Sequence, residues 1–214
     1  HYDNVLHVLK EQFFLSDRLI TKLKKANKIY LNSLPTYTKK SVTVGDTVSV
    51  LIDFDEDNSN IVASNIPLNI IYEDDYLLVL NKPANIAIHP SILHFYNSLS
   101  NGVKFYFDKL GLKKKIRIVN RLDRNTSGIV IFAKNEYIQE CLIKQMKTNE
   151  FKKEYLAIAK GILESKSGTL NFPIARKEGS IIERTVTSDG DSAITHYDVV
   201  KEFNNLYLVH IVLG

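Results

Sequence analysis

The chain has 214 residues, 44% of them hydrophobic and 24% charged, which suffices for one core or for a core with a small satellite domain. Its apolar runs are too short for a transmembrane helix, and its polar start is unlike a secretory signal. The single cysteine, Cys141, excludes an internal disulfide, so we expect a cytoplasmic protein without membrane association.

The formal net charge of +4 lies entirely within residues 1–52, where eight Lys and Arg face four Asp and Glu. A basic module on a neutral body indicates a polyanionic partner. A solvated lysine face would give the same charge pattern, so charge alone leaves both interpretations open.

Residues 1–52 predict a small helix-rich module. A helical stripe starts at Val5, and Ser16 is expected to cap a second helix. A strand over 29–31, a turn over 32–35 and a strand pair broken at Gly45-Asp46 follow. This order, ending in Gly-Asp-x-Val-x-Val, resembles an RNA-binding module first seen in a small-subunit ribosomal protein. The resemblance implies that the second helix lies against RNA phosphates through its basic residues Arg18, Lys22, Lys24 and Lys25.

Residues 53–66 are acidic and polar and predict a linker. We expect it to stay off RNA and to leave the two domains loosely coupled. Residues 67–214 then predict a catalytic domain with a hairpin over 69–80, helices over 98–110 and 136–148, and strands over 129–133, 153–160, 193–203 and 206–213. Strands and helices mix without strict βαβ alternation, which favours an α+β fold with a mainly antiparallel sheet.

The sequence lacks several common catalytic motifs. It has no glycine-rich phosphate loop, no Gly-x-Ser-x-Gly elbow, and no His or Cys with metal-ligand spacing. We therefore expect no metal and no nucleotide cofactor.

The most informative segment surrounds Asp123. Six bases flank this one carboxylate, which keeps it ionised and attracts phosphates. The following Asn-Thr-Ser-Gly is a turn that leads into an apolar strand. An Asp in a turn is more often a local hydrogen-bonding or salt-bridge residue than a catalyst, so the segment alone leaves the role open. The six bases are Lys113, Lys114, Lys115, Arg117, Arg121 and Arg124.

Arg-Leu-Asp-x-x-Thr-Ser-Gly, followed by an apolar strand and Ala-Lys, resembles the signature of the RluA-type pseudouridine synthases. The resemblance covers about 68–213, and the basic module before it suits the RluD-like branch. Further blocks follow in the family order: Glu73-Asp74-Asp75 to Asn81-Lys82-Pro83, His89-Pro90, Lys153-Glu154-Tyr155-Leu156-Ala157 with Gly161, Pro173-Ile174-Ala175-Arg176, and Ala193-Ile194-Thr195-His196-Tyr197.

The resemblance implies isomerisation of uridine to pseudouridine in structured RNA, with large-subunit ribosomal RNA expected and transfer RNA as the alternative. Asp123 is then the nucleophile, attacking either the ribose or the uracil ring of a uridine turned out of its stack. Arg121 inserts where that base was, or simply contacts a phosphate. Arg124 and Lys153 are further expected RNA contacts.

Tyr155 is the second expected catalytic residue. Along 153–160, Tyr155 shares one strand face with two alanines, which leaves room for a base to stack. The resemblance implies that this tyrosine packs on the target base and acts as a general base. A tyrosine that covers a core edge would show the same pattern.

Three departures from the family pattern stand out. Asn120 replaces a common His and is expected to do no chemistry, and Asn85 replaces a common Gly in a turn that tolerates left-handed Asn. After Gly214 the family continues with Thr-Gly-Arg-Thr-His-Gln, whose Arg pairs with the nucleophile. We therefore expect this chain, as a C-terminally truncated monomer, to bind RNA but to catalyse weakly or not at all, with unpaired sheet edges around 206–213.

Two rival interpretations remain: a non-catalytic RNA-binding factor on a synthase-like scaffold, and a carboxylate hydrolase that uses Glu73-Asp74-Asp75. Intact Asp123 and Tyr155 favour the synthase over the first, and a hairpin turn explains the acidic cluster better than the second.

Overall fold

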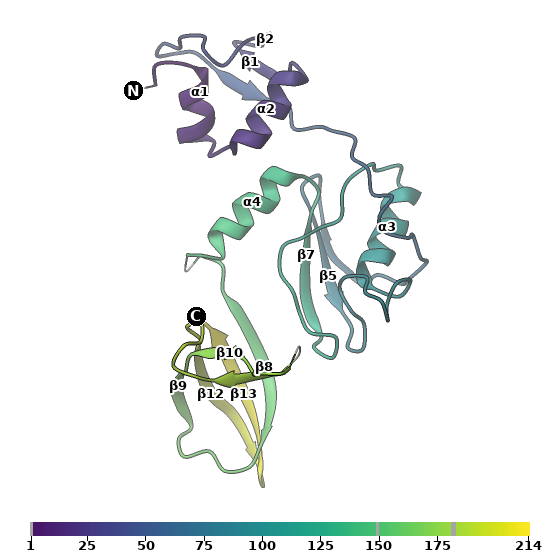
Figure 1. The fold of residues 1–214 in the computed structure, drawn as a ribbon, viewed down its shortest axis with the longest axis vertical. Helices are drawn as coiled ribbons and strands as arrows, with labels where there is room; N and C mark the ends of the chain where they lie inside the picture. The colour runs from purple at the N-terminus through teal and green to yellow at the C-terminus, as the bar shows by residue number, and fades with distance from the viewer. Residues whose placement is uncertain (1, 149, 181–182) are drawn as a thin grey trace. The chain divides into compact units, whose positions relative to one another are not determined.

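The computed structural model describes residues 2–148, 150–180 and 183–214, so His1 of the expected basic module lies outside the described residues. Internal contacts divide the chain into unit 1, up to Lys144, and unit 2, from Gln145 onward. This division falls inside the segment 67–214 that the sequence assigns to one domain. We describe each unit by itself (Figure 1). None of the described helices is long and apolar enough to cross a membrane.

Unit 1 begins with the helix-rich module. Helix α1 (Val5–His7) runs into a π-helical turn, η1 (Val8–Gln12), and helix α2 (Asp17–Lys25) follows. Ser16 caps α2, as expected, because its hydroxyl accepts a hydrogen bond from the backbone N–H of Leu19. The buried side chains of these helices form the module's core with β1: Val5, Leu9, Leu15, Leu19, Ile20, Leu23 and Ile29.

The small sheet of the module differs from the expected strand pair. Strands β1 (Ile29–Leu31), β2 (Leu34–Pro35) and β3 (Val48–Val50) form a sheet in the order β2-β1-β3. The expected strand pair broken at Gly45-Asp46 does not form, because residues 42–47 lie in no strand and β3 pairs with β1 instead. The carboxylate of Asp46 accepts hydrogen bonds from Thr43 and Asn32, which makes this segment a side-chain-stabilised loop.

The rest of unit 1 is a four-stranded sheet covered by a helix. Strands β4 (Ile70–Glu73), β5 (Leu77–Lys82), β6 (Arg117–Ile118) and β7 (Gly128–Ala133) lie in the order β4-β5-β7-β6. Helix α3 (Leu99–Lys109) starts at a capping box between Ser98 and Asn101, and helix α4 (Glu136–Gln145) follows β7. The core joins α3 to β5 and β7 through Leu78, Leu80, Ile88, Leu99, Val103, Phe107, Val130 and Phe132.

The expectation of a loose linker is wrong for residues 53–58, which are hydrogen-bonded to residues 114–117 of the same unit. Glu56 accepts two hydrogen bonds from the guanidinium of Arg117, at 2.5 and 2.7 Å. The side chain of Asn58 bonds to the carbonyl of Lys114 and accepts from the N–H of Ile116. Three of the four acidic side chains of this segment, Asp53, Asp55 and Glu56, therefore pair with bases of the same chain, which the local sequence pattern does not indicate.

Unit 2 contains a four-stranded sheet and a separate strand pair. Strands β8 (Lys153–Lys160), β9 (Ser167–Asn171), β12 (Ile194–Phe203) and β13 (Leu206–Leu213) lie in the order β8-β13-β12-β9. Strands β10 (Ile174–Arg176) and β11 (Arg184–Val186) pair with each other. The expectation of unpaired edges around 206–213 is wrong, because β13 pairs with β8 on one side and β12 on the other.

The α+β fold class is confirmed. Every strand pair among the described residues is antiparallel. The predicted helices and long strands are present, with α4 ending earlier than expected. Strands β2, β6, β9, β10 and β11 were not predicted.

Candidate active site

The loop that carries Asp123 is fixed to the sheet at its start. It connects β6 to β7, and the backbone N–H of Val119 donates to the carbonyl of Ile131 at 2.8 Å. The amide of Asn120 donates to the carbonyl of Ile129 and accepts from the N–H of Ile131, both at 2.9 Å. Asn120 therefore acts on the backbone, consistent with its expected lack of chemistry.

The loop then turns sharply at Asp123. The N–H of Thr126 donates to the carbonyl of Asp123 at 3.1 Å, which closes a turn. Leu122 packs against the core of unit 1. Gly128 opens β7 with a φ of +131°, a conformation that a side chain would strain. Asp123 thus lies between an anchored residue and a rigid strand.

Lys82, at the end of β5, binds the other end of the loop and was not predicted as a functional residue. Its side chain is completely buried, and its ammonium donates to the carbonyls of Pro83, Ile86 and Arg124 at 2.9–3.0 Å. Burial lowers the pKa of Lys82, and the negative charge of Asp123 partly offsets this effect. The Asn-Lys-Pro block was the only signal in the sequence for this residue.

The carboxylate of Asp123 is exposed and makes no hydrogen bond or ion pair within the described part of the chain. Arg121 and Arg124 are also exposed, and neither pairs with a carboxylate among the described residues. The Nε of Arg124 donates to the carbonyl of Asn85 at 3.4 Å. Asn85 has a φ of +66°, which confirms the expected left-handed turn. Within the described residues, one carboxylate and two guanidinium groups are therefore exposed on this loop without forming an ion pair.

Three of the six bases expected around Asp123 are occupied elsewhere. Lys113 pairs with Asp55 at 3.3 Å and Lys114 with Asp53 at 3.1 Å. Arg117 binds Glu56, as described above. The expectation of a six-base field is therefore wrong, because the linker neutralises half of those charges. Arg121 and Arg124 remain on the Asp123 loop itself.

The charge of Arg121 reaches His89 of the His-Pro block. Burial lowers the pKa of His89, and the positive charge of Arg121 lowers it further, so the neutral imidazole is favoured. The segment around His89 is thus part of the surroundings of the Asp123 loop.

Two carboxylates of the acidic cluster proposed for the hydrolase alternative, Glu73 and Asp74, stabilise the fold. Glu73 accepts from the hydroxyl of Tyr106 at 2.6 Å and from the ammonium of Lys134 at 2.8 Å. Asp74 accepts from the backbone N–H groups of Tyr76 and Leu77, which closes the hairpin. Two of its three carboxylates are therefore occupied by the fold, and the hydrolase interpretation loses its support.

The basic helix α2 presents three of its four predicted RNA contacts. Arg18, Lys24 and Lys25 are exposed and form no ion pair with any described residue. Lys22 differs, since its ammonium lies 2.8 Å from Glu136 and 3.3 Å from Glu56, and 4.0 Å from the ring centre of Phe54. Lys22 is thus already engaged inside unit 1.

Tyr155 and Lys153 belong to β8 in unit 2. The predicted alternation is confirmed: Leu156 and Ile158 are exposed on one face, while Tyr155, Ala157 and Ala159 are half-buried on the other. Tyr155 lies opposite Ile211 of β13, and Lys153 lies opposite Leu213. The structure therefore provides the predicted strand face within its own unit.

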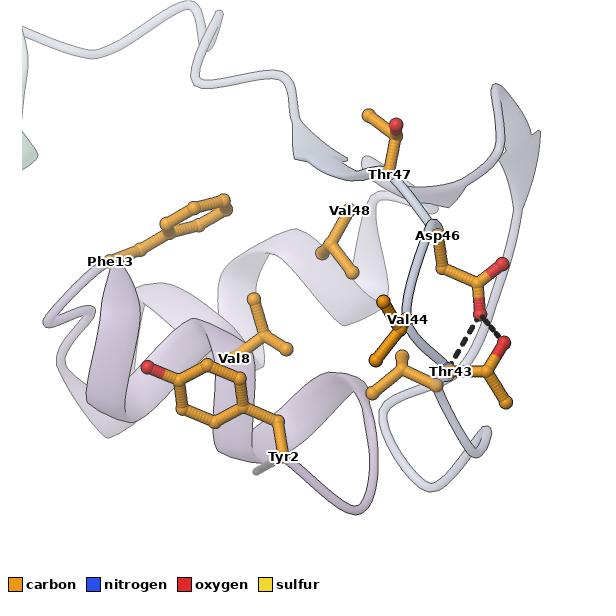
Figure 2. A pocket seen from close by; sticks show the side chains of 9 residues that line it. Tyr2, Val8, Phe13, Thr43, Val44, Asp46, Thr47 and Val48 are labelled. Atoms are coloured by element: carbon orange, nitrogen blue, oxygen red, sulfur yellow. Dashed lines mark hydrogen bonds between the residues drawn. The ribbon is translucent and has the colours of Figure 1, made fainter.

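A hollow of about 490 Å³ in the helix-rich module does not serve as an active site (Figure 2). Its one carboxylate, Asp46, faces Thr43 and accepts hydrogen bonds from the N–H and hydroxyl of that residue. Hydrogen bonds lower the pKa of Asp46; the bond from Asn32 has the largest effect, and the bonds from Thr43 come next. The lining residues are Tyr2, Val8, Phe13, Val42, Thr43, Val44, Asp46, Thr47 and Val48. This lining is mostly apolar, and its acid already stabilises a loop.

Among the residues that the structure describes, no three His, Cys, Asp or Glu side chains are grouped so that they could hold a metal ion. Residues 76–214, more than half of the chain, match the model of the family described as RNA pseudouridylate synthase. The chain belongs to this family. The match includes the Asp123 loop, Lys82 and β8.

Two curated relatives show the extent of the similarity. The chain is 34% identical over 186 residues to the "Uncharacterized RNA pseudouridine synthase YjbO" of Bacillus subtilis, covering 86% of this chain and 66% of the relative. It is 36% identical over 176 residues to the "Ribosomal large subunit pseudouridine synthase D" of Blochmanniella floridana, covering 80% of this chain and 55% of the relative. The chain thus spans between about half and two thirds of these relatives.

Solved structures agree in fold. Human RNA Pseudouridylate Synthase Domain Containing 1 superposes with a TM-score of 0.55 at 21% identity, over 69% of this chain and 59% of that chain. Human RNA Pseudouridylate Synthase Domain Containing 4 gives a TM-score of 0.54 at 20% identity, over 68% and 58%. The α+β fold is therefore that of pseudouridylate synthase domains.

Proposed function

We propose that the protein isomerises uridine to pseudouridine in structured RNA, with Asp123 as the nucleophile. The observation that carries the proposal is the exposed carboxylate of Asp123, which makes no hydrogen bond or ion pair with the described residues and stands on a loop that Lys82 and Asn120 anchor. A covalent catalyst needs both features, because an occupied carboxylate is a poor nucleophile and a mobile one is poorly aligned.

The reaction breaks the bond between the ribose and a uracil nitrogen and forms a bond between the ribose and a ring carbon. The ring carbon then loses its proton, and the nitrogen gains one, so the product is an isomer of the substrate. Asp123 adds to the ribose or to the uracil ring and leaves again when the new bond is complete. In this proposal Tyr155 packs on the base and accepts the proton, and Arg121 fills the position of the extruded base.

We further propose large-subunit ribosomal RNA as the substrate and a cytoplasmic location. The support for the substrate is similarity to a relative named ribosomal large subunit pseudouridine synthase D. The support for the location is the single cysteine, which suits a reducing compartment. The exposed Arg18, Lys24 and Lys25 of α2 supply basic side chains for RNA phosphates, and Arg124 and Lys153 complete the proposed RNA contacts.

The test replaces Asp123 with Asn, which keeps the shape and removes the nucleophile. In the full-length protein, tritium release from ribosomal RNA labelled at uridine C5 should fall by about three orders of magnitude or more, while RNA affinity stays within about twofold. Asp75→Asn is the matched control, because Asp75 is exposed and without a charge partner in the described residues. Turnover of Asp123→Asn within about tenfold of wild type would remove Asp123 from this role.

A further inference from the structure

A loop of unit 1, residues 91–97, exposes four large apolar side chains. Ile92 is 98% exposed, Leu93 85%, Tyr96 65% and Phe95 49%. Soluble proteins rarely gather so many exposed apolar side chains in one short segment unless the segment binds something. We refer to residues 91–97 as the apolar loop.

The apolar loop is held firmly at its base. The N–H groups of Leu99 and Ser100 donate to the carbonyls of Ala87 and Ile88 at 2.8 and 3.0 Å, which ties its two ends together. The fully buried Asn101 donates to the carbonyl of Phe95 at 3.0 Å. The two rings thus project from a fixed backbone, which reduces the entropy lost when they bind a ligand.

The rings of Phe95 and Tyr96 already contact each other edge to face. Their centroids lie 4.9 Å apart, and their planes meet at 81°. This geometry leaves ring surface exposed on the more exposed residue, Tyr96, and a nucleobase can stack on such a surface.

The apolar loop begins a few residues after the segment that lies beside the Asp123 loop. The ammonium of Lys82 joins Ile86 to Arg124 of the Asp123 loop. Ser91 comes five residues after Ile86, a span of at most about 18 Å in a fully extended chain. His89, two residues before the apolar loop, has its pKa lowered by burial and in part by the positive charge of Arg121, so the Arg121 guanidinium lies near His89.

The charge around the apolar loop suits a polyanion. The sequence holds no Asp or Glu between Asp75 and Asp108, so the apolar loop and its neighbours along the chain carry no carboxylate. Arg121, which has no carboxylate partner among the described residues, adds a positive charge beside His89. An RNA strand that reaches Asp123 therefore meets no repelling charge along this segment.

We propose that the apolar loop binds unpaired RNA bases beside the uridine that is modified, with Tyr96 and Phe95 as stacking platforms. This inference rests on the proposed function and extends it. Arg121 is proposed to fill the position of the extruded uridine, so the rings bind unpaired bases outside that position. They accept any such base, because every base has a π face.

The chain contains no tryptophan, so Tyr96→Trp introduces a single fluorescent reporter. The probe is an oligouridylate of about twelve nucleotides, within the length that stacking surfaces commonly cover, compared with a blunt RNA duplex of equal length. Oligouridylate should quench the fluorescence and the duplex should not. Tyr76→Trp is the matched control, because Tyr76 is 56% exposed in the same unit, and its fluorescence should not respond.

A second variant measures the contribution of the rings to affinity. Phe95→Leu combined with Tyr96→Leu keeps the loop apolar and removes both rings, so affinity for oligouridylate should fall about fivefold or more, with duplex affinity unchanged. Unchanged oligouridylate affinity, or an equal loss for the duplex, would overturn the inference. So would a concentration-dependent blue shift of the Tyr96→Trp chain without RNA, which would indicate a contact between copies of the protein.

Turnover of the unsubstituted protein separates this inference from the proposed function. If pseudouridine forms while the double variant binds oligouridylate normally, the apolar loop has no stacking role and the enzyme assignment stands. If the double variant loses affinity as expected but the unsubstituted protein forms no pseudouridine, the stacking surface stands and the enzyme assignment fails.

Discussion

The ammonium of Lys82 joins two segments that are about forty positions apart in the sequence. It satisfies the carbonyls of Ile86, in the segment leading to His89, and of Arg124, the residue after Asp123. A buried lysine is expensive unless its three donors are all used, and here each has a carbonyl acceptor. We therefore regard Lys82 as a positioning residue for the nucleophile.

Replacement of Lys82 by Met should slow the reaction more than it weakens binding. Met keeps an unbranched apolar side chain but frees the carbonyl of Arg124, so Asp123 loses part of its alignment. We expect kcat to fall about tenfold or more, with KM within about threefold. Steady-state kinetics on ribosomal RNA, together with a measured Tm, test this expectation.

Lys134→Met provides the matched control for Lys82→Met. Lys134 is also buried, but its ammonium binds Glu73 and the carbonyl of Asp74 rather than the Asp123 loop. It should lower the Tm without changing kcat of the folded protein. Equal effects of the two substitutions on kcat would show that Lys82 acts only through stability.

At the scale of elements, residues 53–58, which follow β3, hold α2 and β6 together, and we refer to them as the strap. Glu56 is almost buried, and it links α2, through Lys22, to β6, through Arg117. Burial raises the pKa of Glu56, but two hydrogen bonds and the charge of Arg117 outweigh it and lower the pKa to about 2. The charge of this carboxylate is therefore a large part of what holds the strap.

The pH dependence follows from the sign of that shift. Because the pKa of Glu56 falls from 4.5 to about 2 on folding, its contribution is complete above pH 4.5 and is lost as the pH falls toward 2. The shift corresponds to about 3 kcal/mol of unfolding free energy. Glu56→Gln should remove this amount at pH 7 and much less at pH 2, as measured by urea unfolding.

Asp55→Asn provides a matched test of the strap. Asp55 also pairs with a lysine of the same segment, Lys113, but both side chains are about three quarters exposed. Its loss should change the unfolding free energy by less than about 0.5 kcal/mol. If Glu56→Gln and the unsubstituted protein lose stability in parallel between pH 5 and pH 2, the charge of Glu56 does not contribute to the unfolding free energy.

At the scale of the whole molecule, positive charge is concentrated on the helix-rich module. The exposed bases of α2 are separate from Lys22, which the strap and α4 neutralise. Helix α2 therefore allows a comparison of RNA binding between Lys22, which is ion-paired, and Lys24 and Lys25, which form no ion pair with the described residues. RNA affinity measured against salt concentration distinguishes them, because each phosphate contact contributes to the slope.

The triple variant Arg18→Gln, Lys24→Gln, Lys25→Gln should flatten the salt dependence of RNA binding. Three lost phosphate contacts reduce the slope of log affinity against log salt by roughly 2 to 3. Lys22→Gln should leave the slope unchanged and lower stability instead. An unaltered slope in the triple variant would identify these bases as a solvated face.

Local rules in the sequence predicted much of this molecule. Ser16 capped its helix, and Asn85 took the left-handed turn, because each depends on a few neighbouring residues. Glu56 and Arg117 were not matched, because they lie 61 positions apart and nothing nearby marks them as partners. Lys82 was missed for a related reason: its burial depends on three carbonyls that only the fold brings together.

The candidate site shows the same contrast between local features and contacts that are distant in the sequence. The turn at Asp123 and the alternating faces of β8 could be predicted from the sequence, since both are periodic or local features. The charge around Asp123 could not, because the strap neutralises Lys113, Lys114 and Arg117 from a distance.

The strand order of unit 2 has a consequence for synthesis on the ribosome. β8 is made before every other strand of its sheet, yet its only strand partner among the described residues is β13. At about 5–20 residues per second, β13 begins to emerge roughly 2–9 s after β8 is complete. During that interval the exposed Leu156 and Ile158 stand on a strand without any hydrogen-bonded neighbour. A nascent chain at this stage is a natural client for a ribosome-associated chaperone, which would shield β8 until the sheet can close.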